Sequence, residues 1–410
     1  MQWKCRLETG GIFLRHSFFD KCRGRCYNEF TERISRKEGG KMIRVEILAQ
    51  TRAAMRPFVM LPFALYKNDP NWVAPLIGEQ LKSLCEKTAD PRRFFLVYDE
   101  NKPVARVMAG ADTRLNERLG KKYGYIGLFE CMQRPDYART ALDAACAYLK
   151  EEGMEMVIGP TSADFDDFSK GLLVQGFDGP PVIFNPYNPP YYAEYFEKCG
   201  FKKHRDHFAY FMRMDGFDLQ RVEEIVPRAK RRFGFRVQKL EFTKENEQRL
   251  LGDVTRVIRE AFPAEWELNI PTYEDIAKVF SAYRRYYRPE MTMMAYAGNR
   301  PIGLVVAFPN YNQLLIKMKG RILPFGWLKF LLGKNKIYGA RCNMQFVVPE
   351  YQNMGVNTAM FYEAYLEAKK LGIQWVEGST VDETNAASIN NTEKMGTHLY
   401  RVYRQYEREL

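Results

Sequence analysis

The amino-acid sequence predicts an α/β protein of two similar units in tandem, each a mixed, mostly antiparallel sheet flanked by helices. Three observations support this prediction. The chain has 410 residues, more than a single hydrophobic core usually supports. Segments with strand and helix periodicity alternate along it. Phrases of similar sequence also recur at nearly the same spacing in the two halves.

The first 42 residues are expected to lie outside this architecture. They are rich in Arg and Lys and show no regular period. A strand pattern starts only with Ile43, which makes Met42 a candidate start of translation. Residues 1–42 are therefore interpreted as a basic extension that is disordered or not translated. The alternative is a short basic arm that contacts an anionic surface.

The repeat defines the two units. Asn101-Lys-Pro and Asn299-Arg-Pro each turn between two strand-like runs, and Glu197-Lys-Cys-Gly and Glu393-Lys-Met-Gly close the two halves. We expect the same order of strands and helices in each unit. In the first, these elements are 43–48, 52–66, 94–110, 123–132, 137–152 and 154–158; in the second, they are 235–242, 247–262, 292–308, 338–348, 357–371 and 373–381. The units are then 43–214 and 233–410, joined by a linker at 215–232.

Composition narrows the class of function only slightly. The net charge of +12 favours anionic partners: nucleic acid, an acidic membrane or a phosphate-bearing cofactor. Interleaved basic and aromatic motifs are missing, so we expect no nucleic-acid partner. Cys22 and Cys26 have no second pair and no nearby His, so no metal site is expected. With no span of roughly 20 apolar residues and no secretory signal, a cytoplasmic protein is expected.

The most informative segment runs from Phe346 to Asn357, between a predicted strand and a predicted helix. A strand that enters a glycine-containing loop and then a helix aims several backbone N–H groups at one point. The helix N-terminus adds about half a positive charge there, which favours a pyrophosphate. Gly355 would let the backbone approach the phosphates closely.

This loop resembles the acetyl-CoA loop of the GNAT (GCN5-related N-acetyltransferase) family, in which Gln or Arg is followed by two residues, Gly, one residue, and Gly or Ala. Gln352 and Gly355 match, whereas Asn357 departs from the last position. Asn385-Ala-Ala-Ser388 looks like the family's Asn-x-x-Ala, and Lys394-Met-Gly396 resembles its Lys-x-Gly-Phe, with Thr397 in place of Phe.

The resemblance implies two tandem GNAT-like domains that use acetyl-CoA or a longer acyl-CoA. The residues that it assigns to the cofactor are Phe346, Val347, Gln352, Asn353, Met354, Gly355, Val356, Asn357, Thr358, Asn385 and Ser388. A backbone N–H near Phe346 or Val347 would stabilise the oxyanion. The first unit carries Gln133-Arg-Pro-Asp136 where the loop should be, so it is expected to keep the fold without the cofactor.

The acceptor is expected to be an amine. Some bacterial ceramide synthases are GNAT-like, so a lipid or sphingoid amine is a candidate acceptor. Glu377 is the candidate base, because its apolar neighbours on the strand should raise its pKa. Tyr400 and Tyr403 are candidates for the acid or for the wall of the acyl tunnel. Alternatively, Glu377 pairs with a Lys or Arg, and both tyrosines are core residues. Thr392 stands where the family often has its Tyr acid.

Two further segments are open to two interpretations each. The proline-rich loop Asn185–Tyr192 carries Tyr187, Tyr191 and Tyr192, which would form a substrate wall, or else it packs the two domains together. The segment Ile322–Ile337 mixes large apolar residues with lysines. It is interpreted either as a helix in a membrane interface, giving peripheral contact with the inner face of the membrane, or as a buried helical hairpin.

Three functions are compatible with these features. The leading hypothesis is an N-acyltransferase that moves an acyl group from coenzyme A to an amine. The second is a catalytically silent acyl-CoA sensor or scaffold, suggested by Thr392 and Asn357. The third is nucleic-acid binding, which rests on charge alone.

Overall fold

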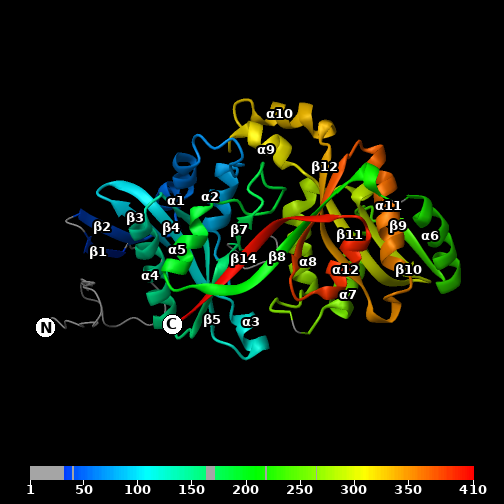
Figure 1. Cartoon of the computed structure of the whole chain (residues 1–410), viewed down its shortest axis with the longest axis horizontal. Coiled ribbons are helices and arrows are strands. Elements are labelled where there is room, and N and C mark those ends of the chain that lie inside the picture. The colour runs from blue at the N-terminus through cyan, green and yellow to red at the C-terminus, as the bar shows by residue number, and fades with distance from the viewer. Residues whose placement is uncertain (1–31, 39–40, 163–170, 218, 265) are drawn as a thin grey trace.

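The computed structural model describes residues 32–38, 41–162, 171–217, 219–264 and 266–410 (Figure 1). Most of the predicted basic extension, including Cys22 and Cys26, lies outside the described residues. The sheet nevertheless begins within that extension, because strand β1 (Glu32–Glu38) pairs antiparallel with β2 (Lys41–Ile47). The predicted boundary at residue 42 therefore falls inside a strand.

The described strands form one 14-stranded sheet in the order β1-β2-β3-β4-β5-β6-β14-β8-β13-β12-β11-β10-β9, with β7 paired to β14. All the pairings are antiparallel except β5 with β6 and β12 with β13. Helices cover both faces (Figure 1). The predicted fold class, a mixed and mostly antiparallel sheet flanked by helices and repeated in tandem, is confirmed.

The described residues of the first half supply eight strands and five helices of this architecture. The strands after β2 are β3 (Arg92–Asp99), β4 (Lys102–Ala111), β5 (Tyr123–Cys131), β6 (Met156–Thr161), β7 (Leu172–Gln175) and β8 (Lys202–Arg213). The helices are α1 (Arg52–Leu65), α2 (Ile77–Cys85), α3 (Thr113–Leu119), α4 (Pro135–Glu151) and α5 (Tyr191–Lys198).

The second half repeats the order after a further helix. Its strands are β9 (Phe235–Lys239), β10 (Thr292–Ala297), β11 (Arg300–Pro309), β12 (Gly339–Val347), β13 (Trp375–Asp382) and β14 (His398–Glu409). Its helices are α6 (Leu219–Phe233), α7 (Glu247–Ala261), α8 (Tyr273–Tyr283), α9 (Asn312–Met318), α10 (Gly326–Gly333), α11 (Val356–Lys370) and α12 (Ala386–Lys394). Residues 215–232, predicted as a linker, thus consist largely of α6, which packs on α11.

Strand alternation divides the core of each half between the two faces of the sheet. In the second half, Met294 and Leu304 pack under α7, whereas Met293 and Val305 pack under α11. In the first half, α1 and α4 cover opposite faces in the same way. The helices α7 and α11 therefore lie on opposite sides of the strands that carry the predicted site.

The last strands of the two halves are exchanged. The C-terminal strand β14 pairs with β6 and β7 of the first half, while β8, the last strand of the first half, pairs with β13 of the second. β8 and β14 also pair with each other over most of their length, and they run side by side across the middle of the molecule (Figure 1). The salt bridge between Arg404 Nε and Asp206 Oδ1, at 2.8 Å, joins them. The two halves therefore share one continuous sheet.

Removal of residues 398–410 is expected to destabilise the first half as well as the second, because β7 loses the strand that it pairs with and β6 keeps only β5. Amide hydrogen exchange at Met156–Thr161 should then approach that of unfolded chain. A chain that starts at Lys41, and so lacks residues 1–40 with the edge strand β1, is the control and should keep its protection. Persistent protection of β6 without β14 would show that the exchange is not needed for folding.

Candidate active site

The site begins where two parallel strands separate. β12 and β13 are in register from Gly339 opposite Trp375 to Cys342 opposite Gly378, and the pairing stops there. β12 continues to Val347 paired only with β11, and β13 continues to Asp382 paired only with β8. A gap opens between them along Asn343–Val347 and Ser379–Asp382. The backbone groups on the gap side of each strand have no ladder partner across it.

A cavity of about 610 Å³ fills this gap and extends to both faces of the sheet. Phe361, Ala364 and Tyr365 of α11 line it from one face, and Ile258 of α7 and Val279 of α8 line it from the other. Since α7 and α11 cover opposite faces, the cavity passes through the sheet between β12 and β13. The volume lies within the range of small-molecule sites in proteins.

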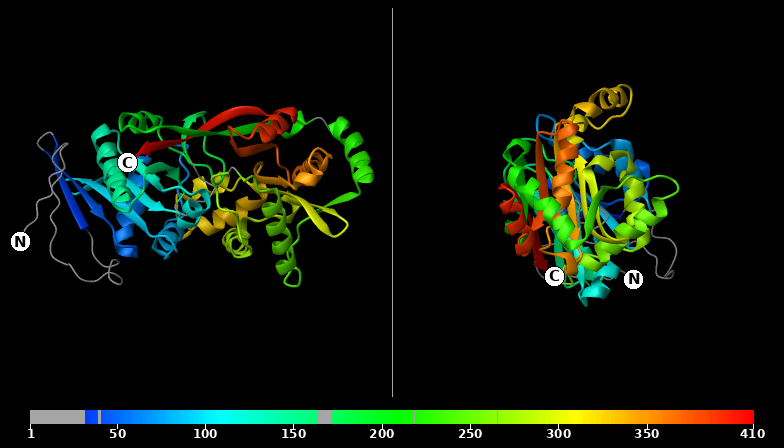
Figure 2. Two further views of the ribbon diagram at one scale, coloured as in Figure 1. Left: turned by 90° about the horizontal axis from the view of Figure 1, so that it is seen from below. Right: turned by 90° about the vertical axis from the view of Figure 1, so that its right-hand side faces the viewer.

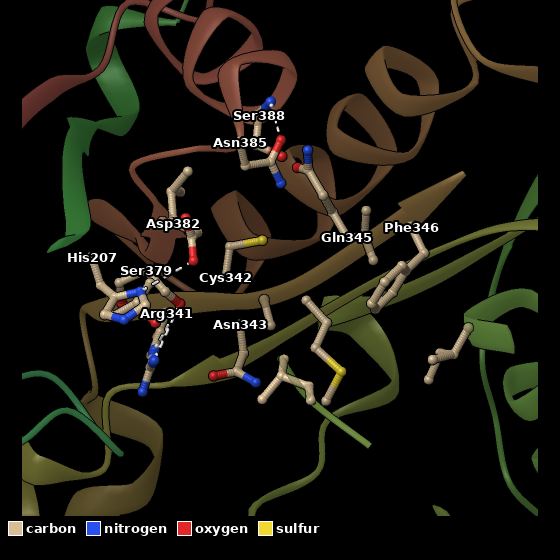
Figure 3. Close-up of a pocket in the computed structure, with 18 of the residues that line it drawn as sticks. His207, Arg341, Cys342, Asn343, Gln345, Phe346, Ser379, Asp382, Asn385 and Ser388 are labelled. Atoms are coloured by element: carbon tan, nitrogen blue, oxygen red, sulfur yellow. Dashed lines mark hydrogen bonds and ion pairs between the residues drawn. The ribbon is translucent and has the colours of Figure 1, made fainter. Parts of the chain in front are cut away.

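The two ends of the cavity differ in chemistry. Figure 3 shows Cys342, Gln345 and Phe346 of β12 around the gap, with Asn385 and Ser388 of α12 on one side. Beyond the gap the wall is largely apolar, with contributions from Met212, Met214, Phe262, Trp266, Ile276 and Met344. Towards the first half of the chain it becomes polar and charged, with His204, Arg205, His207, Glu267 and Asp382.

The predicted phosphate loop follows β12 directly and leads into α11. Gly355 is the N-cap of α11 with a φ of 77°, a left-handed conformation that favours glycine. A Cβ on Gly355 would also come within 3.0 Å of the Ala229 side chain. Asn357 Oδ1 is buried and has no hydrogen-bond partner among the described residues. The first N–H groups of a helix lack intrahelical partners, so this loop presents donors and a close backbone approach to an anion.

Of the predicted cofactor residues, Phe346, Asn385 and Ser388 line the cavity, whereas the residues of the loop do not. Gln352 is exposed, and its Nε2 donates to the Val347 carbonyl at 3.1 Å, which braces the loop. Asn353 has a φ of 62°. Val356 is buried in the core, and Met354 and Thr358 are half-buried beside it. Asn385 caps α12 by accepting a hydrogen bond from the Ser388 N–H at 3.0 Å, so it also positions a cavity wall.

The candidate oxyanion donor is the Val347 N–H. The next amide, of Val348, donates to Ile302 of the neighbouring strand β11, at 3.0 Å. Successive amides of an extended strand point to opposite sides, so the Val347 N–H points towards the gap.

The first half of the chain has an equivalent backbone N–H donor, but that donor is already bonded to a tyrosine hydroxyl. Cys131 is the ninth residue of β5, as Val347 is of β12. Its N–H donates to the Tyr192 hydroxyl at 2.6 Å. Tyr192 precedes the Glu-Lys phrase of its half by five residues, and Ser388 holds that position in the second half. In the first half, the aromatic ring of Tyr192 therefore occupies a space that the smaller Ser388 leaves open in the second half.

The structure places Tyr191 and Tyr192 in the core of the first half rather than at the cavity. Tyr192 is fully buried and also donates to Glu130 Oε2 at 2.9 Å, and Tyr191 donates to the Cys131 carbonyl at 3.0 Å. Tyr187 donates to Asp69 Oδ2 at 2.8 Å and lines a separate cavity of about 200 Å³. The three predicted substrate-binding tyrosines therefore lie away from the gap.

The predicted base Glu377 is fully buried beneath the gap. Its Oε1 accepts hydrogen bonds of 2.5 Å from Asn185 Nδ2 and from the Ser379 hydroxyl, and its Oε2 accepts one from Tyr400. Burial raises the pKa of Glu377, and the nearby Arg341 only partly offsets this. Tyr403 is buried in the same cluster, where burial and the charge of Glu377 raise its pKa. Of this cluster, Ser379 and Arg341 reach the cavity wall.

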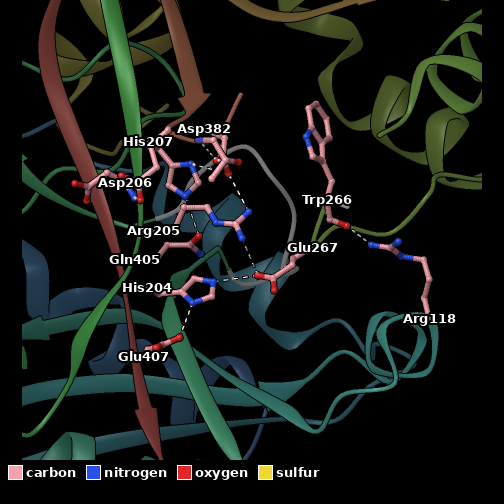
Figure 4. Close-up of polar contacts among 12 residues, drawn as sticks. Arg118, His204, Arg205, Asp206, His207, Trp266, Glu267, Asp382, Gln405 and Glu407 are labelled. Carbon is pink, nitrogen blue, oxygen red and sulfur yellow. Dashed lines mark hydrogen bonds and ion pairs between the residues drawn. The ribbon is translucent and has the colours of Figure 1, made fainter. Parts of the chain in front are cut away.

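A polar network at the charged end of the cavity was not predicted from the sequence (Figure 4). His204 Nδ1 lies 2.6 Å from Glu407 Oε2, and its Nε2 lies 3.0 Å from Glu267 Oε2. The network spans both halves, because His204 and Glu407 lie on the exchanged strands β8 and β14, and Glu267 belongs to the loop before α8. Only the strand exchange brings these residues together.

His207 lies in the same network, next to the gap. Its Nε2 is 2.9 Å from Gln405 Oε1, and its Nδ1 is 4.0 Å from Asp382 Oδ2 (Figure 4). Asp382 ends β13 and keeps a lowered pKa despite its burial, because Thr384 and Arg205 stabilise its charge. A histidine is the group most suited to exchange a proton near neutral pH, and an adjacent carboxylate stabilises its charged form.

Comparisons with known proteins found two related sequences of nearly the same length. No family model matches the chain. Protein YghO of Escherichia coli (strain K12) is 29% identical over 371 residues, covering 87% of this chain and 93% of that protein. The bacterial ceramide synthase of Caulobacter vibrioides is 27% identical over 380 residues, covering 89% and 97%.

Solved structures share the architecture at low sequence identity. A tandem GNAT protein from the clavulanic acid biosynthesis pathway superposes with a TM-score of 0.55, at 11% identity, over 90% of this chain and 98% of that one. This chain has the tandem GNAT fold. A GCN5-related N-acetyltransferase from Sphaerobacter thermophilus gives a TM-score of 0.52 at 11% identity, over 89% and 95% of the two chains. In this fold, the Cys131 N–H of the first half donates to the Tyr192 hydroxyl, whereas the Val347 N–H of the second half faces the gap between β12 and β13.

Two further properties of the described residues bear on function. No group of three or more His, Cys, Asp or Glu side chains among them is arranged to hold a metal ion. No helix among them combines the length and the apolar character needed to cross a bilayer.

His204 is expected to make stability depend on pH. Burial alone would lower its pKa, but Glu267 and Glu407 outweigh burial and raise it above the ordinary value of 6.5. The stabilisation is therefore complete below pH 6.5 and is lost as the pH rises through the raised value. The thermal unfolding midpoint should decrease as the pH rises from 6 to 9. In His204→Gln, this decrease should be smaller by several degrees. The exposed His398→Gln is the control; an unchanged slope in His204→Gln would contradict the assignment.

Proposed function

We propose that this protein is an acyl-CoA-dependent N-acyltransferase whose single acyl-CoA site lies in the second predicted unit, residues 233–410. The observation that carries the proposal is the cavity through the sheet, bordered by β12 where that strand leads towards the glycine-capped start of α11, and by a charged, histidine-containing wall. The first predicted unit, 43–214, contributes that wall and holds no cofactor of its own.

The donor would bind along β12 and α11. The N–H groups from Gly355 to Thr358 would hold the pyrophosphate, and the arm of the thioester would enter the gap past Asn385 and Ser388. The Val347 N–H would donate to the thioester oxygen as negative charge develops on it. The apolar wall around Met212, Met344 and Trp266 has room for an acyl chain longer than acetyl.

The acceptor would be an amine that approaches from the charged end. The amine nitrogen attacks the thioester carbon, the new C–N bond forms, the C–S bond breaks, and the thiolate of coenzyme A leaves and takes a proton from water. The resemblance to a ceramide synthase over 89% of the chain supports a lipid or sphingoid amine.

His207 would accept the proton that the amine loses, directly or through one water molecule. With Nε2–H donated to Gln405, the lone pair lies on Nδ1, and Asp382 would stabilise the imidazolium that forms. In this account Asp382 and Gln405 are positioning residues. Glu377 links β13 to the Asn185 loop and to Tyr400 of β14, in place of the Lys or Arg partner of the alternative interpretation, and Tyr403 is a buried residue.

Release of free coenzyme A from acyl-CoA of several chain lengths, with a panel of amines that includes sphingoid bases, tests the proposal. His207→Gln should lower kcat by about 100-fold or more with little change in KM, and it should remove the acidic limb of the pH–rate profile. Glu377→Gln is the matched control: it should lower thermal stability and leave the shape of the profile unchanged.

Two outcomes would contradict this account. Tight acyl-CoA binding without coenzyme A release on any amine would favour the silent sensor, which Thr392 and Asn357 suggest. A pH–rate profile altered by Glu377→Gln and untouched by His207→Gln would return the role of base to Glu377.

A further inference from the structure

The α9–α10 hairpin, residues 312–337, carries an unusual surface. Seven of the eleven exposed large apolar side chains of the described residues belong to it: Ile322, Leu323, Phe325, Trp327, Leu328, Leu331 and Leu332. Leu323, Leu332 and Phe325 are 73%, 68% and 67% exposed. A folded chain rarely leaves a contiguous apolar surface of this kind uncovered unless something binds it.

The hairpin is firmly held at its base, so its exposure is not a sign of a loose segment. Tyr311 stacks on Phe330, with ring centroids 5.7 Å apart, and Leu314 is buried against the core. The Gly320 carbonyl accepts a hydrogen bond from the Ile77 N–H of the first half at 3.1 Å. The tip projects beyond the body of the molecule (Figure 2). A rigid base and a projecting apolar tip suit contact with a large external surface.

The charge around the apolar residues identifies that surface. The hairpin contains six basic residues, Lys317, Lys319, Arg321, Lys329, Lys334 and Lys336, and no Asp or Glu. None of the six forms an ion pair with another described residue. Two copies of the hairpin face to face would bring twelve positive charges together, which disfavours self-association. A lipid bilayer with an apolar interior and anionic headgroups matches both the apolar side chains and the basic residues of the hairpin.

We propose that the α9–α10 hairpin docks on the surface of a bilayer that contains anionic phospholipid, with its apolar tip in the interface and its basic residues at the headgroups. This inference stands apart from the proposed reaction, since it rests on the exposed surface and not on the cavity. It supplies a reason why a protein with no spanning helix among its described residues would meet a lipid acceptor.

Sedimentation with vesicles tests the inference, using phosphatidylcholine alone and a mixture of phosphatidylcholine with phosphatidylglycerol, without acyl-CoA or amine. The parent protein should bind the mixed vesicles, and binding should weaken as salt rises. Leu323→Ser combined with Leu332→Ser should weaken binding by about tenfold or more. Lys334→Gln combined with Lys336→Gln should weaken it by roughly 25-fold, about fivefold for each charge.

Matched controls separate docking from general effects. Leu371→Ser changes an apolar residue that is 37% exposed elsewhere, and Lys67→Gln combined with Lys87→Gln removes the same charge from the first half. These variants should bind as the parent does, and all should keep the parent's circular dichroism and unfolding midpoint. Tryptophan fluorescence, to which Trp327 contributes as one of five tryptophans, should also shift to the blue with mixed vesicles and stay unshifted in the leucine variant.

The inference is overturned if the parent does not bind mixed vesicles, or if the leucine variant binds them as tightly as the parent. It is also overturned if the parent forms dimers without lipid that the leucine variant lacks, because the hairpin would then be a self-interface. Since the vesicle assay contains no acyl-CoA and no amine, an absence of vesicle binding would leave the proposed acyl transfer intact. An absence of acyl transfer would likewise leave the proposed membrane docking intact.

Discussion

The separation of β12 from β13 is the constraint on which the rest of the structure depends. Two parallel strands that stay paired for four residues and then part leave unpaired backbone groups, and these would be costly to bury without partners. The cavity follows from this divergence, as does the free space on the gap side of Val347, whose N–H points away from β11. The first half shows the alternative solution, in which the Tyr192 hydroxyl satisfies the equivalent amide and its ring fills the space.

The exchange of β8 and β14 makes the two halves depend on each other for a complete sheet. β14 completes the sheet of the first half, and β8 extends that of the second, so neither half has a complete sheet alone. The exchange also carries His204, His207, Gln405 and Glu407 to the charged end of the cavity. The first half is thus a structural partner that forms one wall of the site, and the buried cluster around Glu377 fixes the junction between the halves.

Local patterns in the sequence predicted the repeated elements well, because each has a clear period and a clear end. The predicted helix 357–371 is observed at Val356–Lys370, and the predicted strand 338–348 at Gly339–Val347. The exchange could not be predicted, since β14 alternates equally well beside either half. Because His207 reaches the charged end of the cavity only through this exchange, the sequence did not point to it. Glu377, in contrast, was suggested by the apolar neighbours on its own strand. The aligned Glu-Lys phrases, which place Tyr192 opposite Ser388, did contain the signal for the closed first half.

The most direct test is whether the gap between β12 and β13 holds the thioester arm. Gly378 lines the gap, and a Cβ there would meet nothing within 4 Å, so a larger side chain would fill the cavity without displacing the core. Acyl-CoA affinity of Gly378→Phe should be measured by calorimetry, with Gly78→Phe, at an exposed and equally open position, as control. The account predicts that Gly378→Phe folds normally and loses long-chain acyl-CoA affinity by about 100-fold or more, roughly 3 kcal/mol, while Gly78→Phe binds as the parent does. Equal affinity in Gly378→Phe and the parent would contradict it.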